Sequence, residues 1–211
     1  MEEPKSPARH SAGDLSIESL TEPDSILAAV PELARLRIQV FREFPYLYDG
    51  SLDYERKYLR IYASTPGAIV VTARDTADAG RIVGAATAMP LAAEQEELLA
   101  HFRAAELPVK NTYYCAESVL EAGYRGRGAG HAFFDHREAR AKALGFKECY
   151  FLAVDRPEDH SRRPPDYRPH NTFWTKRGYA EVPGFRASFS WRDLDEIDAS
   201  PKPMRLWQRQ L

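Results

Sequence analysis

The sequence predicts a single α/β (α+β) domain in which a mixed, mostly antiparallel sheet carries flanking helices and a central parallel βαβ pair. The chain has 211 residues, the usual length of one globular domain. Residues 67–73 and 81–88 are apolar, strand-like runs joined by a short polar turn, which is typical of an antiparallel hairpin. A strand-like run at 112–120, a helical pattern at 129–144 and an apolar run at 148–155 then follow one another as in a right-handed βαβ unit.

The composition narrows the kind of protein. The chain carries 29 Lys and Arg against 31 Asp and Glu, a balance that argues against a surface built mainly to bind nucleic acid. No apolar stretch is long enough to span a bilayer, and the N-terminus lacks a hydrophobic signal segment. Both cysteines, Cys115 and Cys149, lie in apolar runs, so we expect buried thiols and no metal site. We therefore expect a cytoplasmic monomer or homodimer without a nucleic-acid or membrane partner.

The N-terminal part begins without periodicity. Residues 1–13 contain prolines, charges and small residues, so we expect a disordered tail before a domain that spans 14–211. Residues 15–20 alternate apolar and polar, as in a strand. Pro31 is expected to open the first helix, because proline is favoured at the first helical position, and a second helix follows at 52–63.

The remaining elements flank the βαβ unit. Residues 94–106 form an acidic amphipathic pattern, which predicts a helix with a solvated charged face. The helix expected at 129–144 has an apolar stripe that includes His136, which we therefore expect to be a core histidine. Two last strands, near 187–191 and 203–208, complete the sheet.

The segment that joins the strand 112–120 to the following helix is rich in glycine and arginine. Glycines allow a tight bend or a close backbone approach to a ligand. The unpaired N–H groups and the dipole of a helix N-terminus favour an anion, and two arginines add positive charge there. These residues are Arg125, Gly126, Arg127, Gly128 and Gly130. The pattern predicts a site for a cofactor that bears a diphosphate.

Two common phosphate-binding loops do not match this segment. Gly123 and Gly128 have the spacing of the Walker pattern, but Ala129 and Gly130 stand where Lys and Ser or Thr are required. The dinucleotide-binding fingerprint requires a third small residue, and His131 occupies that position.

The pattern Arg125-x-x-Gly128-x-Gly130, preceded by a hydrophobic strand that ends at Leu120, resembles the acyl-CoA-binding loop of the GNAT N-acetyltransferase superfamily. One departure is Ala122, where many members carry proline. The resemblance implies a GNAT fold, acetyl-CoA as the cofactor, and two central strands that splay apart around its pantetheine arm. The cofactor-binding residues that it implies are Val119, Leu120, Arg125, Gly126, Arg127, Gly128, Ala129, Gly130, His131, Asn171 and Trp174.

Glu117 is the candidate catalytic residue. It is a carboxylate in a run that otherwise favours burial, which is costly unless the group is paired, hydrogen-bonded or protonated. Burial would raise its pKa towards the range of a general base. The alternative is a structural glutamate that holds a neighbouring loop or an arginine.

The acceptor substrate is expected to lie near an aromatic turn and a basic loop. In the family, the region between the first two helices lines the acceptor end of the cleft, which makes Tyr46, Tyr48 and Asp49 candidate contacts. The alternative is that the tyrosines pack and that Asp49 with Gly50 makes a turn. Arg156 begins a long loop and either holds an acceptor carboxylate or is exposed.

The segment 170–179 resembles the last short helix of the family, with one departure. Many members carry there a tyrosine that protonates the leaving thiolate, but this sequence has Trp174. Indole cannot act as that acid, so Tyr167 or a water molecule must serve instead.

The function that these residues and the resemblance imply is transfer of an acetyl group from acetyl-CoA to a primary amine of a small molecule, by direct attack in a ternary complex. Three alternatives remain: a non-catalytic acyl-CoA sensor, an acyltransferase with another acyl group, and a transferase with a protein or peptide acceptor.

Overall fold

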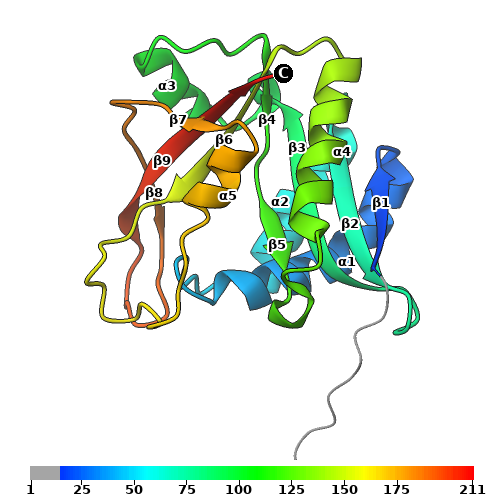
Figure 1. Ribbon diagram of the computed structural model, residues 1–211, viewed down its shortest axis with the longest axis horizontal. Helices are drawn as coiled ribbons and strands as arrows, with labels where there is room; N and C mark the ends of the chain where they lie inside the picture. Colours follow the sequence, from blue (N-terminus) through cyan, green and yellow to red (C-terminus); the bar gives the residue numbers. More distant parts are fainter. Residues whose placement is uncertain (1–14) are drawn as a thin grey trace, which may run out of the picture.

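The computed structural model describes residues 15–211, which form one mixed α/β domain (Figure 1). The tail expected at residues 1–13 lies outside the described residues. The first half contains β1 (Leu15–Leu20), α1 (Pro23–Phe41), α2 (Leu52–Ser64), β2 (Ile69–Asp75), β3 (Arg81–Pro90), the short 3-10 helix η1 (Leu91–Ala93) and α3 (Glu96–Ala104). The second half contains β4 (Thr112–Tyr114), β5 (Ser118–Leu120), the 3-10 helix η2 (Ala122–Tyr124), α4 (Ala129–Ala143), β6 (Glu148–Val154), α5 (Asn171–Lys176), β7 (Ala180–Glu181), β8 (Ala187–Trp191) and β9 (Ser200–Gln210).

The strands of residues 15–211 form one nine-stranded sheet in the order β1-β2-β3-β4-β6-β9-β7, with β5 on β3 and β8 on β9. β2 and β3 pair antiparallel, with Ile69 opposite Ala88, which confirms the expected hairpin. β4 and β6 are parallel, with Thr112 opposite Glu148, and α4 connects them, which confirms the βαβ unit. The predicted fold class, mostly antiparallel with one central parallel pair, is therefore confirmed.

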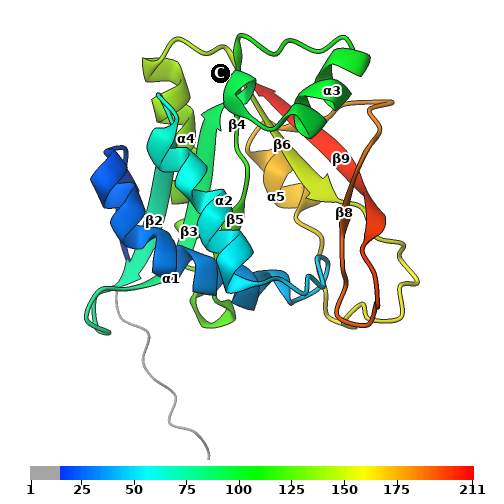
Figure 2. The same ribbon diagram turned by 180° about the vertical axis from the view of Figure 1, so that it is seen from behind.

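The helices cover both faces of the sheet (Figures 1 and 2). On one face, α1 and α2 contribute buried residues such as Leu33 and Leu59 to a core shared with Ile82 of β3. On the opposite face, Phe133 of α4 packs with Val83 of β3. α3 lies on the same face as α1 and α2 (Figure 2) and adds Leu98, Leu99 and Phe102 to a third cluster over β4, β6 and β9. Within residues 15–211, no helix is both long and apolar enough to cross a membrane.

The strand expected over residues 112–120 is broken in its middle, and this corrects the prediction. Its first part, β4, pairs with β6, and the N–H of Cys115 still donates to the carbonyl oxygen of Tyr150 at 2.8 Å. The N–H of Ala116 turns instead to Thr87 of β3 at 3.1 Å, and β5 then pairs with β3. Beyond Tyr150, β6 pairs with β9 on its other edge. β5 and β6 therefore diverge, as Figure 1 shows.

The first helix begins earlier than expected. Pro23, not Pro31, occupies the first turn of α1, and Pro31 lies exposed inside the helix. A proline in a helix interior loses one hydrogen bond and is usually disruptive. The buried stripe of Ile26, Val30 and Leu33 runs across this position, so packing against the sheet outweighs the lost bond.

The buried face of α4 also differs from the expected one. His136 is only half-buried, and its Nδ1 lies 2.7 Å from the hydroxyl of Ser19. The neighbouring Arg137 and Glu138 are buried in its place. Each has polar partners: Arg137 donates to backbone carbonyls, and Glu138 accepts from the hydroxyl of Tyr179 at 3.1 Å. A core tolerates charged side chains that are paired, but not isolated ones. The buried face of α4 therefore contains two charged residues, and the pattern of apolar residues in the sequence did not predict it.

Candidate functional site

The divergence of β5 and β6 opens a cavity of about 1010 Å³. Its walls come from residues 115–118 and Leu120 on one side and from Phe151 to Val154 of β6 on the other. One end is formed by the glycine-rich loop and the N-terminus of α4, and the loop of residues 156–170 closes part of the rim. Because the pairing with β6 ends at Cys115, main-chain groups of β5 and β6 face a shared space beyond that point.

The glycine-rich loop has the conformation that its sequence predicts. Gly126 and Gly128 have φ values of 79° and 87°, in the left-handed region that favours glycine. Gly128 is the N-cap of α4 and offers no side chain to the first helical N–H groups. An added Cβ at either glycine would meet nothing within 4 Å, so a ligand can approach the backbone closely. The positive end of the helix dipole therefore faces the cavity without a built-in anion.

The structure brings most of the candidate cofactor-binding residues together. Those that line the first cavity are Leu120, Arg125, Gly126, Gly128, Gly130, His131, Asn171 and Trp174. The other three are outside the described lining. Val119 and Ala129 are buried in the core, whereas Arg127 donates to the carbonyl oxygen of Gly123 at 2.9 Å and lies over the ring of Tyr124. Arg125 bonds Glu43 at 2.7 Å and thereby links the loop to the segment after α1.

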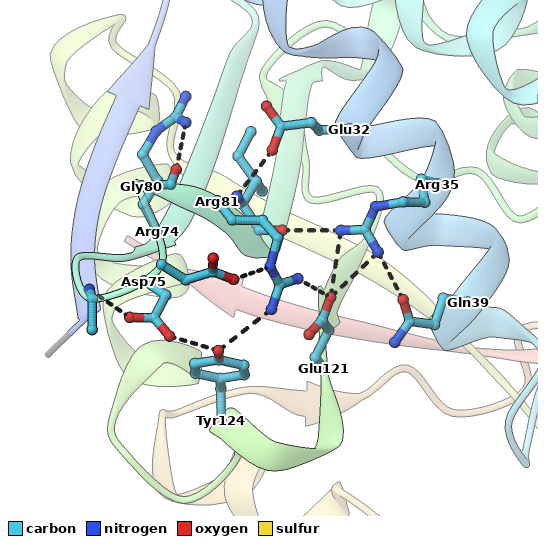
Figure 3. Close-up of polar contacts among 12 residues, drawn as sticks. Glu32, Arg35, Gln39, Arg74, Asp75, Gly80, Arg81, Glu121 and Tyr124 are labelled. Carbon is cyan, nitrogen blue, oxygen red and sulfur yellow. Dashed lines mark hydrogen bonds and ion pairs between the residues drawn. The ribbon is translucent and has the colours of Figure 1, made fainter. Parts of the chain in front are cut away.

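A set of polar contacts anchors the loop to the rest of the sheet (Figure 3). Glu121 accepts from Arg81 at 2.7 Å and from Arg35 of α1 at 3.4 Å. The hydroxyl of Tyr124 donates to Asp75 at the end of β2 at 2.6 Å, and this bond lowers the pKa of Asp75. The turn before the anion site is thus tied to β2, β3 and α1, which fixes the direction of the helix N-terminus.

A second cavity, of about 470 Å³, adjoins the first. The two share Phe41, Tyr46, Ala116, Glu117 and Leu152 in their walls. Ala116 and Glu117 belong to the break between β4 and β5, so the break that opens the first cavity also joins it to the second. Two reactants that occupied the two cavities would meet at Glu117.

Glu117 is buried, with 8% of its surface exposed. Its Oε2 lies 2.8 Å from Nη1 of Arg37, whose Nε is 2.5 Å from Oε2 of Glu55. Arg37 comes from α1 and Glu55 from α2, so one guanidinium bridges two buried carboxylates. Within residues 15–211, Oε1 of Glu117 is buried without a hydrogen-bond partner. The structure shows that Glu117 holds an arginine, as the structural interpretation expects, and it also places Glu117 in the walls of both cavities. Its catalytic role stays a prediction.

The backbone of Glu117 is held as firmly as its side chain. Its carbonyl oxygen accepts from the N–H of Thr87 and from Nη1 of Arg137, each at 3.1 Å. Arg137 is 1% exposed and also donates to Thr87 at 3.4 Å. The buried guanidinium thus adds a second donor to two carbonyl groups that already accept backbone N–H groups where β4 gives way to β5.

Of the three candidate substrate contacts in the aromatic turn, two line a cavity and one does not. Tyr46 faces both cavities, and burial raises its pKa to about 12, so its hydroxyl stays protonated. Tyr48 lines the second cavity. Asp49 is outside the described lining of both cavities and pairs with Arg42 and Arg192. Its neighbour Gly50 packs against the ring of Tyr48, and the turn expected at Asp49 and Gly50 is absent, since both follow the bridge of Tyr48 to Asp193 in extended chain.

Arg156 faces the first cavity, but its hydrogen bonds are already used. It pairs with Asp193 at 2.8 Å and donates to the carbonyl oxygens of Pro45 and Tyr46, each at 2.8 Å. The side chain therefore fixes the aromatic turn beside both cavities.

Trp174 lies in an aromatic cluster at the first cavity. Its ring centroid is 5.0 Å from that of Phe151 and 5.1 Å from that of Trp207. Tyr167 lines the same cavity and packs edge-on against Phe44 at 4.6 Å. Burial raises the pKa of Tyr167, which keeps its hydroxyl a proton donor at neutral pH.

Several residues that shape the two cavities had escaped the sequence analysis. They are Arg37, Glu55, Glu94, Arg137 and Trp191. Arg37 and Arg137 have a detectable signal, since each interrupts the apolar stripe of a helix, and a charge in that position requires a partner. The identity of the partner depends on the fold, and the sequence alone does not supply it.

Solved structures of acetyltransferases share this fold. A GCN5-related N-acetyltransferase from Kribbella flavida has 16% sequence identity and a TM-score of 0.56, with coverage of 93% of this chain and 98% of that one. A ribosomal-protein-alanine N-acetyltransferase from Brucella melitensis has 13% identity and a TM-score of 0.59, with coverage of 93% and 99%. An IAA acetyltransferase from Bacillus cereus has 11% identity and a TM-score of 0.52, with coverage of 94% and 100%. At such identities the likeness concerns the fold alone.

The sequence profile of the acetyltransferase (GNAT) family matches residues 34–163, more than half of the chain. The protein therefore belongs to the GNAT acetyltransferase family, and the resemblance found in the glycine-rich loop is confirmed. A comparison with curated proteins gave no match.

The ion pairs of Arg37 with Glu55 and Glu117 predict that this arginine is important for stability. Replacing Arg37 by Met keeps an apolar stem but leaves Glu55 and Glu117 buried beside each other without a counter-ion. Breaking a buried pair in this way costs about 3–5 kcal/mol of unfolding free energy. Urea denaturation followed by circular dichroism measures the change.

Arg42→Met is the matched control. Arg42 follows the same helix but is half-exposed and pairs with Asp49 at the surface, where such a pair contributes at most about 1 kcal/mol. Equal losses for the two variants would contradict the structural role assigned to Arg37.

Proposed function

We propose that the protein is an acetyl-CoA-dependent N-acetyltransferase that acetylates a primary amine of a small molecule. The observation that carries this proposal is the junction of two cavities at Glu117, one of which ends on an uncapped helix N-terminus. The first cavity is suited to the cofactor and the second to the acceptor. Both reactants then lie in one cleft, and such positioning lowers the barrier to a direct reaction.

The residues of the first cavity fit acetyl-CoA. The diphosphate is assigned to the N–H groups of residues 126–131, where the helix dipole and Arg125 provide positive potential. The pantetheine arm is assigned to the gap between β5 and β6, where Leu152 and Ala153 line the cavity. When bound, acetyl-CoA supplies the activated thioester, and the protein supplies orientation, a proton acceptor and a hydrogen-bond donor.

Glu117 is the proposed base. An aliphatic ammonium group has a pKa near 10 and must lose a proton before its nitrogen can attack a carbonyl carbon. Oε1 of Glu117, which is buried without a hydrogen-bond partner in the described chain, is the proposed acceptor of this proton, directly or through water.

A backbone N–H of β5 is the proposed oxyanion donor. The carbonyl of Glu117 and the N–H of Glu121 both bond to β3. Because bonding alternates along an antiparallel strand, the N–H of Val119 is directed to β3 and that of Leu120 to the gap. Leu120 is therefore preferred over Val119. A preorganised donor of this kind contributes about 3 kcal/mol to lowering the barrier.

The leaving thiolate requires a proton, and Trp174 cannot supply it. Tyr167 is the proposed acid, because its protonated hydroxyl belongs to the same cavity wall. A water molecule is the alternative. A Tyr167→Phe variant that keeps the wild-type rate would favour water.

Three other functions are distinguished from this one by experiment, and the first, an acyltransferase with another acyl group, predicts faster thiol release from a different acyl-CoA. A sensor that binds acyl-CoA without turnover is compatible with Trp174, whereas a transferase acting on proteins requires an open acceptor groove. Assays of thiol release with a panel of small amines separate them. Release of CoA with a small amine supports the proposed activity, and binding of acetyl-CoA without any release supports the sensor.

Gly128→Ala tests the anion site. A non-glycine residue in the left-handed region is strained by about 1–2 kcal/mol, and relief of that strain would rotate the first N–H groups of α4 away from the ligand. We expect at least tenfold weaker CoA binding by calorimetry, together with a small loss of stability.

Gly145→Ala is the matched control for this variant. Gly145 follows the other end of α4, has a φ of 83° and has equally open surroundings, so it carries the same strain far from the loop. If both variants lose affinity equally, or if neither does, the diphosphate does not bind at residues 126–131.

Glu117→Gln tests the base. The amide keeps the shape of the side chain but cannot accept the proton, so we expect kcat to fall by roughly 10²-fold at neutral pH. The deficit should shrink as the pH approaches the pKa of the amine, because the free amine then forms without a base. Steady-state rates from pH 6.5 to 9.5 measure this, with CoA affinity as the check on folding. A constant ratio of variant to wild-type rates across that range would remove Glu117 from the role of base.

A further inference from the structure

The second cavity has an aromatic wall. Eight of its lining residues are aromatic: Phe41, Tyr46, Tyr48, Tyr54, Tyr58, Tyr114, Phe189 and Trp191. The faces of such rings attract cations, and aromatic walls are a recurrent way of binding organic ammonium groups. The same rings provide apolar area for the body of a small ligand. Arg37 already lies over the rings of Phe41 and Tyr58, and Arg156 and Lys202 lie over that of Trp191. The other five rings of the wall therefore favour a ligand that combines an apolar body with a positive charge.

The charged side chains that line this cavity leave an excess of negative charge. Its two arginines are occupied: Arg37 pairs with Glu55 and Glu117, and Arg192 pairs with Asp49. Their positive charge is therefore matched by carboxylates of the protein itself. Two further carboxylates, Glu94 and Glu97, line the cavity.

Glu94 differs from a surface carboxylate. It follows η1 and precedes α3, and its Oε2 accepts the N–H of Gln95 at 3.3 Å. Its Oε1 is buried and, in the chain from residue 15 to residue 211, has no hydrogen-bond partner. The nine-tenths-buried Glu117 lines the same cavity, and its Oε1 is likewise buried and, in the described chain, without a hydrogen-bond partner. A carboxylate charge with few hydrogen bonds in a partly buried place is costly, and a cation in the cavity would stabilise that charge without having to donate a hydrogen bond.

The environment of Glu94 makes its charge sensitive to pH. Burial raises its pKa to about 7, the bond from Gln95 opposes this, and the charge of Glu117 adds to it. The other charged and titratable groups that line the cavity are Tyr46, Tyr48, Tyr54 and Tyr58, Tyr114 of β4, Glu117, Arg37 of α1, Glu97 of α3 and Arg192. Tyr62 of α2 lies behind them, and the charge of Glu94 contributes to its raised pKa. Burial raises the pKa values of Tyr58 and Tyr114, so both stay neutral, and the arginines stay charged.

We infer that the second cavity selects an acceptor that enters as an organic cation, an ammonium group on a compact apolar or aromatic body, and that Glu94 is the specificity residue that pairs with this charge. The inference rests on the proposed function, because it names the acceptor class of that site. Glu94 holds the cation, whereas Glu117 lies at the junction with the first cavity and takes the proton.

The experiment measures binding with ligands that cannot react. The probes are phenethyltrimethylammonium, whose charge does not titrate, and the uncharged 2-phenylethanol, with affinities from calorimetry on the full chain at pH 6 and pH 8. With a pKa near 7, about one tenth of Glu94 is charged at pH 6 and about nine tenths at pH 8. Wild-type affinity for the cation should therefore rise up to about tenfold between these values, while that for the alcohol stays constant.

Glu94→Gln should remove both the pH dependence and the preference for the cation. Glu96→Gln is the matched control, since Glu96 begins α3, is exposed and pairs with Arg103, and it should behave like the wild type. Glu97→Gln tests the adjacent carboxylate of the cavity and should retain most of the pH dependence.

The inference is overturned if the cation binds no better than the alcohol, if neither binds, or if Glu94→Gln keeps the preference. It is also overturned if the pH dependence disappears in Glu97→Gln and not in Glu94→Gln. Thiol release from acetyl-CoA, assayed separately, distinguishes the two proposals. Selective cation binding without turnover contradicts the transfer activity alone, whereas turnover with an unchanged preference in Glu94→Gln contradicts this inference alone.

Discussion

The interruption of one parallel strand pair is the constraint on which the site depends. β4 and β6 exchange backbone bonds only as far as Cys115 and Tyr150, and the chain then turns to β3. A continuous pair would have closed the first cavity and covered the main-chain groups of β5 and β6. It would also have separated Glu117 from the junction of the two cavities. Cleft, candidate base and candidate oxyanion donor thus follow from the same local irregularity.

Such an interruption needs support, because backbone groups that leave a ladder must find other partners. Arg137 of α4 supplies donors to the carbonyls of Thr87 and Glu117 from one face of the sheet. Arg37 of α1 binds the Glu117 side chain from the other face. Two buried guanidinium groups, on helices from opposite layers, therefore both hold Glu117, in the break between β4 and β5. The anchoring of Glu121 and Tyr124 shown in Figure 3 continues this support into the anion-binding loop.

The regular parts of this fold could be predicted because their signals are local. Alternation and periodicity mark the hairpin, and the order of strand, glycine loop and helix marks the βαβ unit and the left-handed glycines before α4. The break at residues 115–117 has no such signal, because Cys115 and Ala116 are as apolar as their neighbours. The helix start at Pro23 and the buried Arg137 were missed because tertiary packing and pairing outweighed local preference in both cases.

The candidate site could be predicted only in part, for a related reason. Glycines and arginines of the loop are adjacent in sequence, and eight of the eleven candidate cofactor contacts line one cavity. The second cavity is assembled from α1, α2, the segment after β3 and the last strands, so its charge balance depends on contacts between distant residues. Asp49 and Arg156 were identified as polar residues of suitable loops, but the fold directs them to Arg192 and Asp193. The sequence predicted that Glu94 belongs to a solvated acidic helix, but burial raises its pKa and distinguishes it from the other carboxylates of that segment.

The central claim is that the gap between β5 and β6 and the N-terminus of α4 together bind acetyl-CoA. A crystal structure of the full chain grown with CoA tests it most directly. The account predicts a diphosphate within hydrogen-bond distance of the N–H groups of residues 126–131 and a pantetheine arm between β5 and β6, with its sulfur directed towards Glu117. CoA bound elsewhere, or a gap closed by renewed pairing of β5 with β6, would contradict it.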